Sequence, residues 1–151
     1  MFWGCISAQC KLPIIEIRGN LNADRYCNEV LEPSVVPHFD GHALADRPIF
    51  MQDGASCHTA RVSLSLLRRN EIEILDWPSK SPDQNPIEHI WDWIKREINS
   101  PEKNIRTLAE LRTEIVTAWN AIQQNDIRRL ISSCSRRVNA LIAARGDFTR
   151  Y

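Results

Sequence analysis

Apolar residues form two short runs at the start of the chain and then recur at helical spacing. The runs 2–7 and 12–17 are rich in β-forming residues and are separated by a small polar connector, which is typical of a β-hairpin or meander. Asn22 can serve as the N-cap of a helix that we expect Pro33 and Pro37 to limit. The opening segment therefore predicts two strands, in a hairpin or meander, followed by one helix.

A strand, a helix and a second strand are predicted next. Residues 47–53 form an apolar run that ends in Asp53, as expected for a buried strand that places this carboxylate at its C-terminal end. Thr59 is the predicted N-cap of a helix that extends to about Arg69, and the alternating run 71–78 follows as another strand. This order predicts a βαβ unit with at least one parallel strand pair.

The second half of the chain is predicted to be helical. Asn85 is the expected N-cap and Pro86 the first residue of a helix with one apolar stripe, formed by Ile87, Ile90, Trp91, Ile94 and Ile98. Three further helices are predicted, over residues 108–122, 127–133 and 135–144. We therefore expect strands and the first helices in residues 1–78 and a helical part in residues 82–151.

Length and composition favour one globular domain, because the chain has 151 residues of which 43% are hydrophobic and 25% charged. The net charge is zero, but residues 1–103 carry a net charge of −4 and residues 104–151 carry +4. An acidic site beside a basic flank is compatible with this distribution. The 5 cysteines show no CxxC pair, which favours a reducing compartment. No leader or membrane-spanning run is found, which disfavours secretion and membrane insertion.

Two carboxylates are candidates for metal chemistry because of where they lie. Asp53 ends a predicted strand, Glu88 lies in the first turn of a predicted helix, and 34 residues separate them. Mg²⁺ prefers oxygen ligands, and strand ends and helix starts are rigid platforms for such ligands. Each residue also has a structural explanation: Asp53 could cap a turn before Gly54, and Glu88 could form a capping box with Asn85.

Three long motifs identify a family resemblance: FMQDGASCHTAR (50–61), LDWPSKSPDQNPIEHIWDWIK (75–95) and SSCSRRVNALIAARGDFTRY (132–151). They resemble the catalytic domain of the Tc/mariner superfamily of DDE transposases. The resemblance spans essentially the whole chain. It implies an RNase H-like α/β fold, a mixed sheet flanked by helices, in which three acidic residues hold two Mg²⁺ or Mn²⁺ ions.

Within this resemblance Asp53 corresponds to the second acid and Glu88 to the third, because Glu88 is the acidic residue of SPDQNPIE at the family's spacing. The family's first aspartate lies on a strand that precedes MFWG, and its helix-turn-helix modules precede the catalytic domain. We therefore expect residues 1–151 to lack both and to be inactive as given. Smaller departures from the family pattern, at Gly54, Ser56 and Gln84, remove no metal ligand.

The resemblance also implies DNA as the partner, a nuclear location and a possible homodimer. Residues that could contact DNA phosphates are His58, Arg128, Arg129, Arg136 and Arg137. For each arginine a solvated helix face explains the pattern equally well, and for His58 a structural role is favoured.

Two rival hypotheses remain open at this point. One is a non-catalytic derivative, either a degenerate copy or a host-adopted protein that binds DNA or another partner. The other is an unrelated metal-dependent hydrolase, which would need a third ligand such as Asp46, Asp76 or Asp92. For Asp92 a solvated helix face with Lys95 or Arg96 is the preferred explanation.

Overall fold

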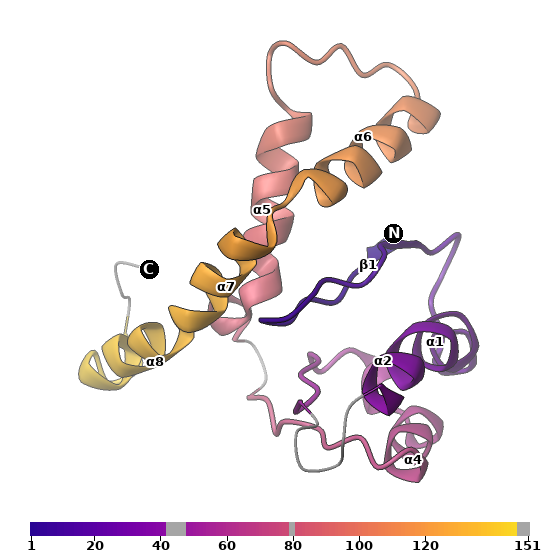
Figure 1. Cartoon of the computed structure of the whole chain (residues 1–151), viewed down its shortest axis with the longest axis vertical. Helices are drawn as coiled ribbons and strands as arrows, with labels where there is room; N and C mark the ends of the chain where they lie inside the picture. The colour runs from indigo at the N-terminus through magenta and orange to yellow at the C-terminus, as the bar shows by residue number, and fades with distance from the viewer. Residues whose placement is uncertain (42–47, 79–80, 148–151) are drawn as a thin grey trace. The chain divides into compact units, whose positions relative to one another are not determined.

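The computed structural model describes residues 1–41, 48–78 and 81–147. It contains two compact units, one formed by residues 1–3 and 15–80 and the other by residues 4–14 and 81–151. Both units are drawn in Figure 1, where the colour runs along the chain. We describe each unit by itself.

An antiparallel hairpin begins the chain, as predicted. Strand β1 (Phe2–Trp3) pairs with strand β2 (Ile15–Glu16), with Phe2 opposite Glu16 and Trp3 opposite Ile15. This ladder belongs to the first unit, and the tip of the hairpin, with an isolated bridge between Ile6 and Lys11, belongs to the second. The strands are much shorter than the apolar runs that predicted them.

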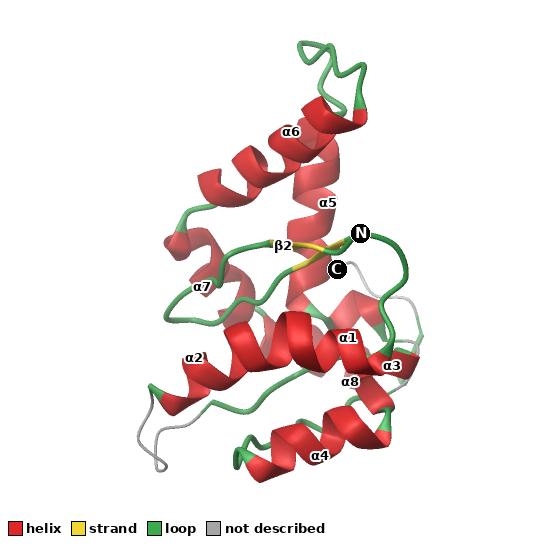
Figure 2. Cartoon of the chain, turned by 90° about the vertical axis from the view of Figure 1, so that its right-hand side faces the viewer, coloured by secondary structure: helices red, strands yellow, loops and turns green. Residues whose placement is uncertain are grey.

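One continuous helical segment follows the hairpin in the first unit, shown in Figure 2. It consists of α1 (Ala23–Tyr26), the π-helix η1 (Cys27–Val35) and α2 (Val36–Asp40), and Asn22 caps it by accepting a hydrogen bond from Arg25 N–H at 2.9 Å. The prediction that prolines limit this helix was wrong. Pro33 lies within η1 and Pro37 lies at the start of α2, and neither ends the helical segment, which continues to Asp40.

Among the described residues of the first unit, parallel pairing is limited to one bridge, between Phe50 and Ile74. Phe50 N–H donates to Glu73 O and Leu75 N–H donates to Phe50 O, both at 2.8 Å. The predicted parallel direction is therefore correct, but residues 48–53 and 71–78 do not form the regular strands expected, and Arg47 lies outside the described residues. Two paired strands alone are marginally stable. Ile49 is 52% exposed, although a buried strand was predicted at this position.

Two helices replace the single helix predicted after Asp53. They are α3 (Ser56–Thr59) and α4 (Arg61–Arg69), and α4 buries Ser63, Leu66 and Leu67. The predicted N-cap at Thr59 was wrong. Ala60, in an extended conformation, is the N-cap of α4, whereas Thr59 Oγ1 donates to Ala55 O at 3.2 Å and so ends the preceding turn.

The helices of the second unit agree closely with the predictions. A 3₁₀ turn, η3 (Pro82–Gln84), precedes α5 (Pro86–Ile98), and α6 (Leu108–Ala121), α7 (Gln124–Ser132) and α8 (Cys134–Ala143) follow. No helix in the described ranges is both long and apolar enough to span a membrane.

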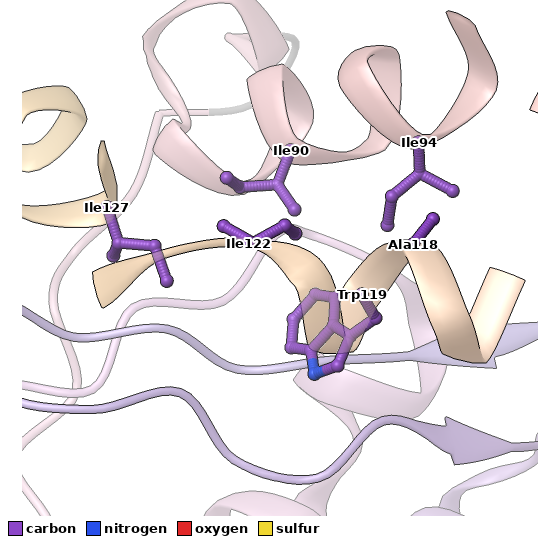
Figure 3. Close-up of a cluster of buried hydrophobic side chains, with 6 residues drawn as sticks. All are labelled: Ile90, Ile94, Ala118, Trp119, Ile122 and Ile127. Atoms are coloured by element: carbon purple, nitrogen blue, oxygen red, sulfur yellow. The ribbon is translucent and has the colours of Figure 1, made fainter. Parts of the chain in front are cut away.

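The apolar core of the second unit lies where α5 and α6 pack together (Figure 3). Its buried members are Ile90, Ile94, Ala118, Trp119, Ile122 and Ile127. Trp119 is 1% exposed, stacks on Trp91 with ring centroids 5.4 Å apart, and donates its indole N–H to Leu12 O at 3.1 Å. Lys11 Nζ donates to Trp119 O, Asn120 O and Ile122 O, and so caps the end of α6. The core therefore holds α5, the helix whose first turn carries Glu88.

Candidate functional site

Asp53 lies in the first unit, in the loop between Phe50 and α3. Its side chain is 58% exposed. One carboxylate oxygen, Oδ1, accepts a hydrogen bond from Ala55 N–H at 3.0 Å and lies 2.6 Å from His58 Nδ1. The other oxygen, Oδ2, has no hydrogen-bond partner among the described residues. The turn-capping role and an open coordination position are therefore present on the same side chain.

His58 is held on several sides in α3. Its side chain is 14% exposed, and its ring centroid lies 4.5 Å from that of Tyr26. Gln52 Nε2 donates to the backbone carbonyl of His58 at 3.2 Å, and the Tyr26 hydroxyl donates to Gln52 Oε1 at 2.9 Å. A phosphate contact or a structural role was predicted for His58, but nothing in the sequence indicated this network with Tyr26 and Gln52.

Cys57, next to His58, is a buried structural residue. The residue is 8% exposed, and Ser63 Oγ donates to its backbone carbonyl at 2.6 Å. Burial raises the pKa of the Cys57 thiol, and the negative charge of Asp53 adds to this effect. The thiol is therefore held in its protonated form, which is the poorer nucleophile and metal ligand.

Glu88 lies in the second unit, in the first turn of α5, and is half-buried. Asn85 caps this helix: its Oδ1 accepts from Ile87 N–H at 3.2 Å, while its backbone carbonyl accepts from Glu88 N–H at 3.2 Å. The sequence signals at Asn85 and Pro86 thus placed Glu88 correctly on the helix. A negative charge is favourable there because of the helix dipole.

Arg137 lies close to the start of α5 and is a buried residue, 2% exposed. Its Nη1 donates to His89 Nε2 at 2.5 Å and its Nη2 donates to Cys134 Sγ at 3.1 Å. The prediction that Arg137 contacts DNA phosphates is therefore corrected, because the guanidinium is enclosed by the protein. It links α8 to the residue that follows Glu88.

The other three arginines predicted to contact phosphates are exposed and lie on α7 and α8 in the second unit. Arg128 donates to Ala8 O at 3.0 Å and to Asn125 Oδ1 at 2.9 Å. Arg129 is 83% exposed and forms an ion pair with Asp126 at 3.4 Å. Arg136 lies on the exposed side of α8. Their contact with DNA stays a prediction.

No group of three or more His, Cys, Asp or Glu side chains that could hold a metal ion occurs within residues 1–41, 48–78 and 81–147. Of the alternative third ligands, Asp46 lies outside the described residues. The carboxylates of Asp53 and Glu88 belong to separate units, and each has the hard oxygen donors that Mg²⁺ and Mn²⁺ prefer. The open Oδ2 of Asp53 fits such an ion.

Residues 3–112 match the DDE superfamily endonucleases, a range that contains both Asp53 and Glu88. The chain belongs to this family. The predicted resemblance is thereby confirmed.

Curated relatives of this DDE chain are transposases of nematode elements. All of the chain aligns with the Tc3 transposase of Caenorhabditis elegans at 31% identity and with the Tcb1 transposase of Caenorhabditis briggsae at 34%. It covers 45% and 54% of these two proteins, so it spans about half the length of the curated relatives it matches.

Solved structures similar to this DDE chain are those of the Mos1 transposase. The Mos1 catalytic domain with Raltegravir and Mg matches over 99% of this chain and 76% of that one, with a TM-score of 0.81 and 18% identity. The corresponding structure with Mn gives a TM-score of 0.79 at 18% identity. This likeness establishes the RNase H-like α/β fold of the DDE enzymes, as predicted.

Proposed function

We propose that residues 1–151 form part of the catalytic domain of a Tc/mariner-type DNA transposase, in which Asp53 and Glu88 hold divalent metal ions. The observation that carries this proposal is how the two carboxylate oxygens of Asp53 are engaged. Its carboxylate is exposed, fixed through Oδ1 and open at Oδ2, inside the stretch that matches the endonuclease family. Glu88 supports it, since the first turn of α5 presents a second carboxylate at the family's spacing.

The two side chains would hold Mg²⁺ or Mn²⁺ through carboxylate oxygens. Bound ions of this kind activate a water or a 3′-hydroxyl for attack on a phosphodiester and stabilise the leaving oxygen. The task of this chain's residues is to fix the oxygens in place. Asp53 does so through a turn and a histidine bond, and Glu88 does so through its position on a packed helix.

DNA is the proposed substrate, in agreement with the relatives, which are named transposases, and with the Mos1 strand transfer complex, which has a TM-score of 0.67 to this chain. Arg128, Arg129 and Arg136 are proposed to contact phosphates, because exposed arginines on α7 and α8 provide affinity that does not depend on sequence. A nuclear location and a homodimer follow as further proposals.

The metal site is tested by adding Mn²⁺ to ¹⁵N-labelled protein and following paramagnetic line broadening. We expect broadening centred on residues 52–54 and 87–89. Loss of a residue that hydrogen-bonds to a metal ligand typically weakens metal binding by ~10–100-fold. Asp53→Asn and Glu88→Gln change the ligands themselves, so each should weaken Mn²⁺ binding by more than this. Asp92→Asn, one turn after Glu88 on the same helix, is the matched control and should leave binding unchanged. Equal broadening in Asp53→Asn, Glu88→Gln and the wild type would contradict the proposal.

A second experiment tests activity. We propose that residues 1–151 alone do not nick a DNA duplex with Mg²⁺ or Mn²⁺. The reason is that we assign none of these residues to the position of the family's first acidic residue. Nicking by the purified wild type that Glu88→Gln abolishes would overturn this part of the proposal and leave the metal assignment intact.

A further inference from the structure

The carboxylate of Asp53 is constrained more than its exposure suggests. A side chain that is 58% exposed ordinarily samples several rotamers, and a surface carboxylate gains little from a single neighbour. Asp53 Oδ1 instead has two partners from the next five residues, the N–H of Ala55 at 3.0 Å and Nδ1 of His58 at 2.6 Å. Both partners are on the same oxygen, so the remaining oxygen is the one left for a ligand.

His58 can fix Asp53 only because it is fixed itself. The imidazole is 14% exposed and lies against the ring of Tyr26, at an interplanar angle of 46°. Tyr26 is fully buried, and its hydroxyl orients Gln52, whose amide donates to the backbone carbonyl of His58. The chain of contacts therefore runs from the buried core of the first unit to an exposed carboxylate.

The hydrogen bond between His58 and Asp53 also determines that Nδ1 is the imidazole nitrogen that carries the proton. An ionised carboxylate can only accept hydrogen bonds, so Nδ1 of His58 must carry the proton when it bonds to Asp53. Histidines and carboxylates that bond to metal ligands orient those ligands, and their loss typically weakens metal binding by ~10–100-fold.

We infer that His58 is a positioning residue that holds Asp53 with Oδ1 engaged and Oδ2 free, so that Asp53 binds a divalent cation through one oxygen. This inference rests on the proposed function, because it takes Asp53 to be a metal ligand. It assigns His58 a role toward Asp53 in place of a phosphate contact.

Two variants separate the hydrogen bond from the ring contact. His58→Phe keeps an aromatic ring against Tyr26 and removes the donor, whereas His58→Asn places an amide N–H at the position of Nδ1 and removes the ring. The first measurement needs no metal: three-bond couplings of the Asp53 side chain report its rotamer in the full chain. We expect one dominant rotamer in the wild type and in His58→Asn, and averaged couplings in His58→Phe.

The second measurement is Mn²⁺ affinity from line broadening. We expect His58→Phe to lose about tenfold or more in affinity and His58→Asn to retain most of it. The imidazole ¹⁵N spectrum of the wild type should show a proton on Nδ1, which checks the bond without any substitution. Thermal unfolding of each variant identifies a loss of fold.

The possible results distinguish this inference from the proposed function. If Asp53→Asn weakens Mn²⁺ binding but His58→Phe keeps the wild-type rotamer and affinity, the role of His58 is overturned and the metal assignment stands. If Asp53→Asn and Glu88→Gln bind Mn²⁺ as the wild type does, the proposed function fails, whatever His58 does to the rotamer. An Nδ1 without a proton in the wild type also overturns the inference.

Discussion

The surroundings of Asp53 and Glu88 differ in what holds each carboxylate in place. Asp53 lies in a loop with one parallel bridge nearby, and hydrogen bonds from Ala55 N–H and His58 Nδ1 hold its carboxylate. Gln52 supports this arrangement by donating to the backbone carbonyl of His58. Glu88 lies on a helix that an apolar core holds through Ile90 and Ile94. The first arrangement depends on single hydrogen bonds and the second on buried area distributed over many side chains.

This difference determines how each site should respond to change. One substitution at a hydrogen-bond donor can release Asp53 while the fold remains intact, as tested above with His58. The helix that carries Glu88 is capped by Asn85, whose Oδ1 accepts from the backbone N–H of Ile87. Damage to the core or to this helix end should therefore disturb the position of Glu88.

Loss of the Trp119 side chain is the largest perturbation we predict for the region of Glu88. Trp119→Ala removes a 1% exposed ring, its stack on Trp91 and its bond to Leu12 O, and should lower the free energy of unfolding by about 3–5 kcal/mol. Chemical denaturation measures this decrease in the free energy of unfolding, and hydrogen exchange should show faster opening of α5. Leu108→Ala, on the same helix but 69% exposed, is the control and should change little. A small effect of Trp119→Ala would contradict the claim that burial holds Glu88.

Gly4 gives the next largest effect, because of its close approach to the tryptophan pair. A Cβ at Gly4 would lie 2.5 Å from Trp119 Cη2 and 3.1 Å from Trp91 Cη2, so Gly4→Ala should cost about 1–3 kcal/mol through overpacking. Gly54→Ala is the matched control, since nothing lies within 4 Å of its Cβ position, and it should stay within about 0.5 kcal/mol of the wild type.

A double substitution identifies the cause of the Gly4 effect. If the clash with the indole is responsible, Gly4→Ala should cost less in a Trp119→Phe background than in the wild type, and the two changes should not be additive. Additive costs would show that the alanine acts elsewhere.

The second-unit helices could be predicted from sequence because their signals are local. Asn85, Pro86 and a regular apolar stripe determine where α5 begins and which face it buries, and the structure confirms each of these. A buried arginine has no such signal. Arg137 was grouped with exposed arginines of α7 and α8 because charge pattern alone does not show that a guanidinium bonds to His89 and Cys134.

The surroundings of Asp53 could be predicted only in part. The sequence placed Asp53 after an apolar segment and before a turn, and both are present. The strand lengths were wrong because strand pairing depends on partners distant in sequence. The bond from Tyr26 to Gln52 spans 26 residues, so the support behind His58 could not be found from local pattern. Pro33 was misjudged because a π-helix is rare and has no clear sequence signal.

The smallest effect that we predict is a pH dependence at the start of α6, which the start of α4 should not share. Thr107 and Glu110 form a capping box on α6, and Glu110 Oε2 accepts from the N–H groups of Arg106 at 2.7 Å and Thr107 at 3.0 Å. These bonds lower the pKa of Glu110 below its ordinary value of 4.5. The N-cap of α4 is Ala60, which provides no side-chain hydrogen bond.

A lowered pKa in the folded state means that the ionised form of Glu110 stabilises the fold at pH values above 4.5, and that this contribution is lost as the pH falls through the folded pKa. We therefore expect hydrogen-exchange protection of the first turn of α6, corrected for intrinsic rates, to fall on acidification from pH 5 to about 3. Glu110→Gln keeps an acceptor that does not titrate and should remove this dependence, and the first turn of α4 should not share it. Equal loss of protection in Glu110→Gln would assign the effect to another group.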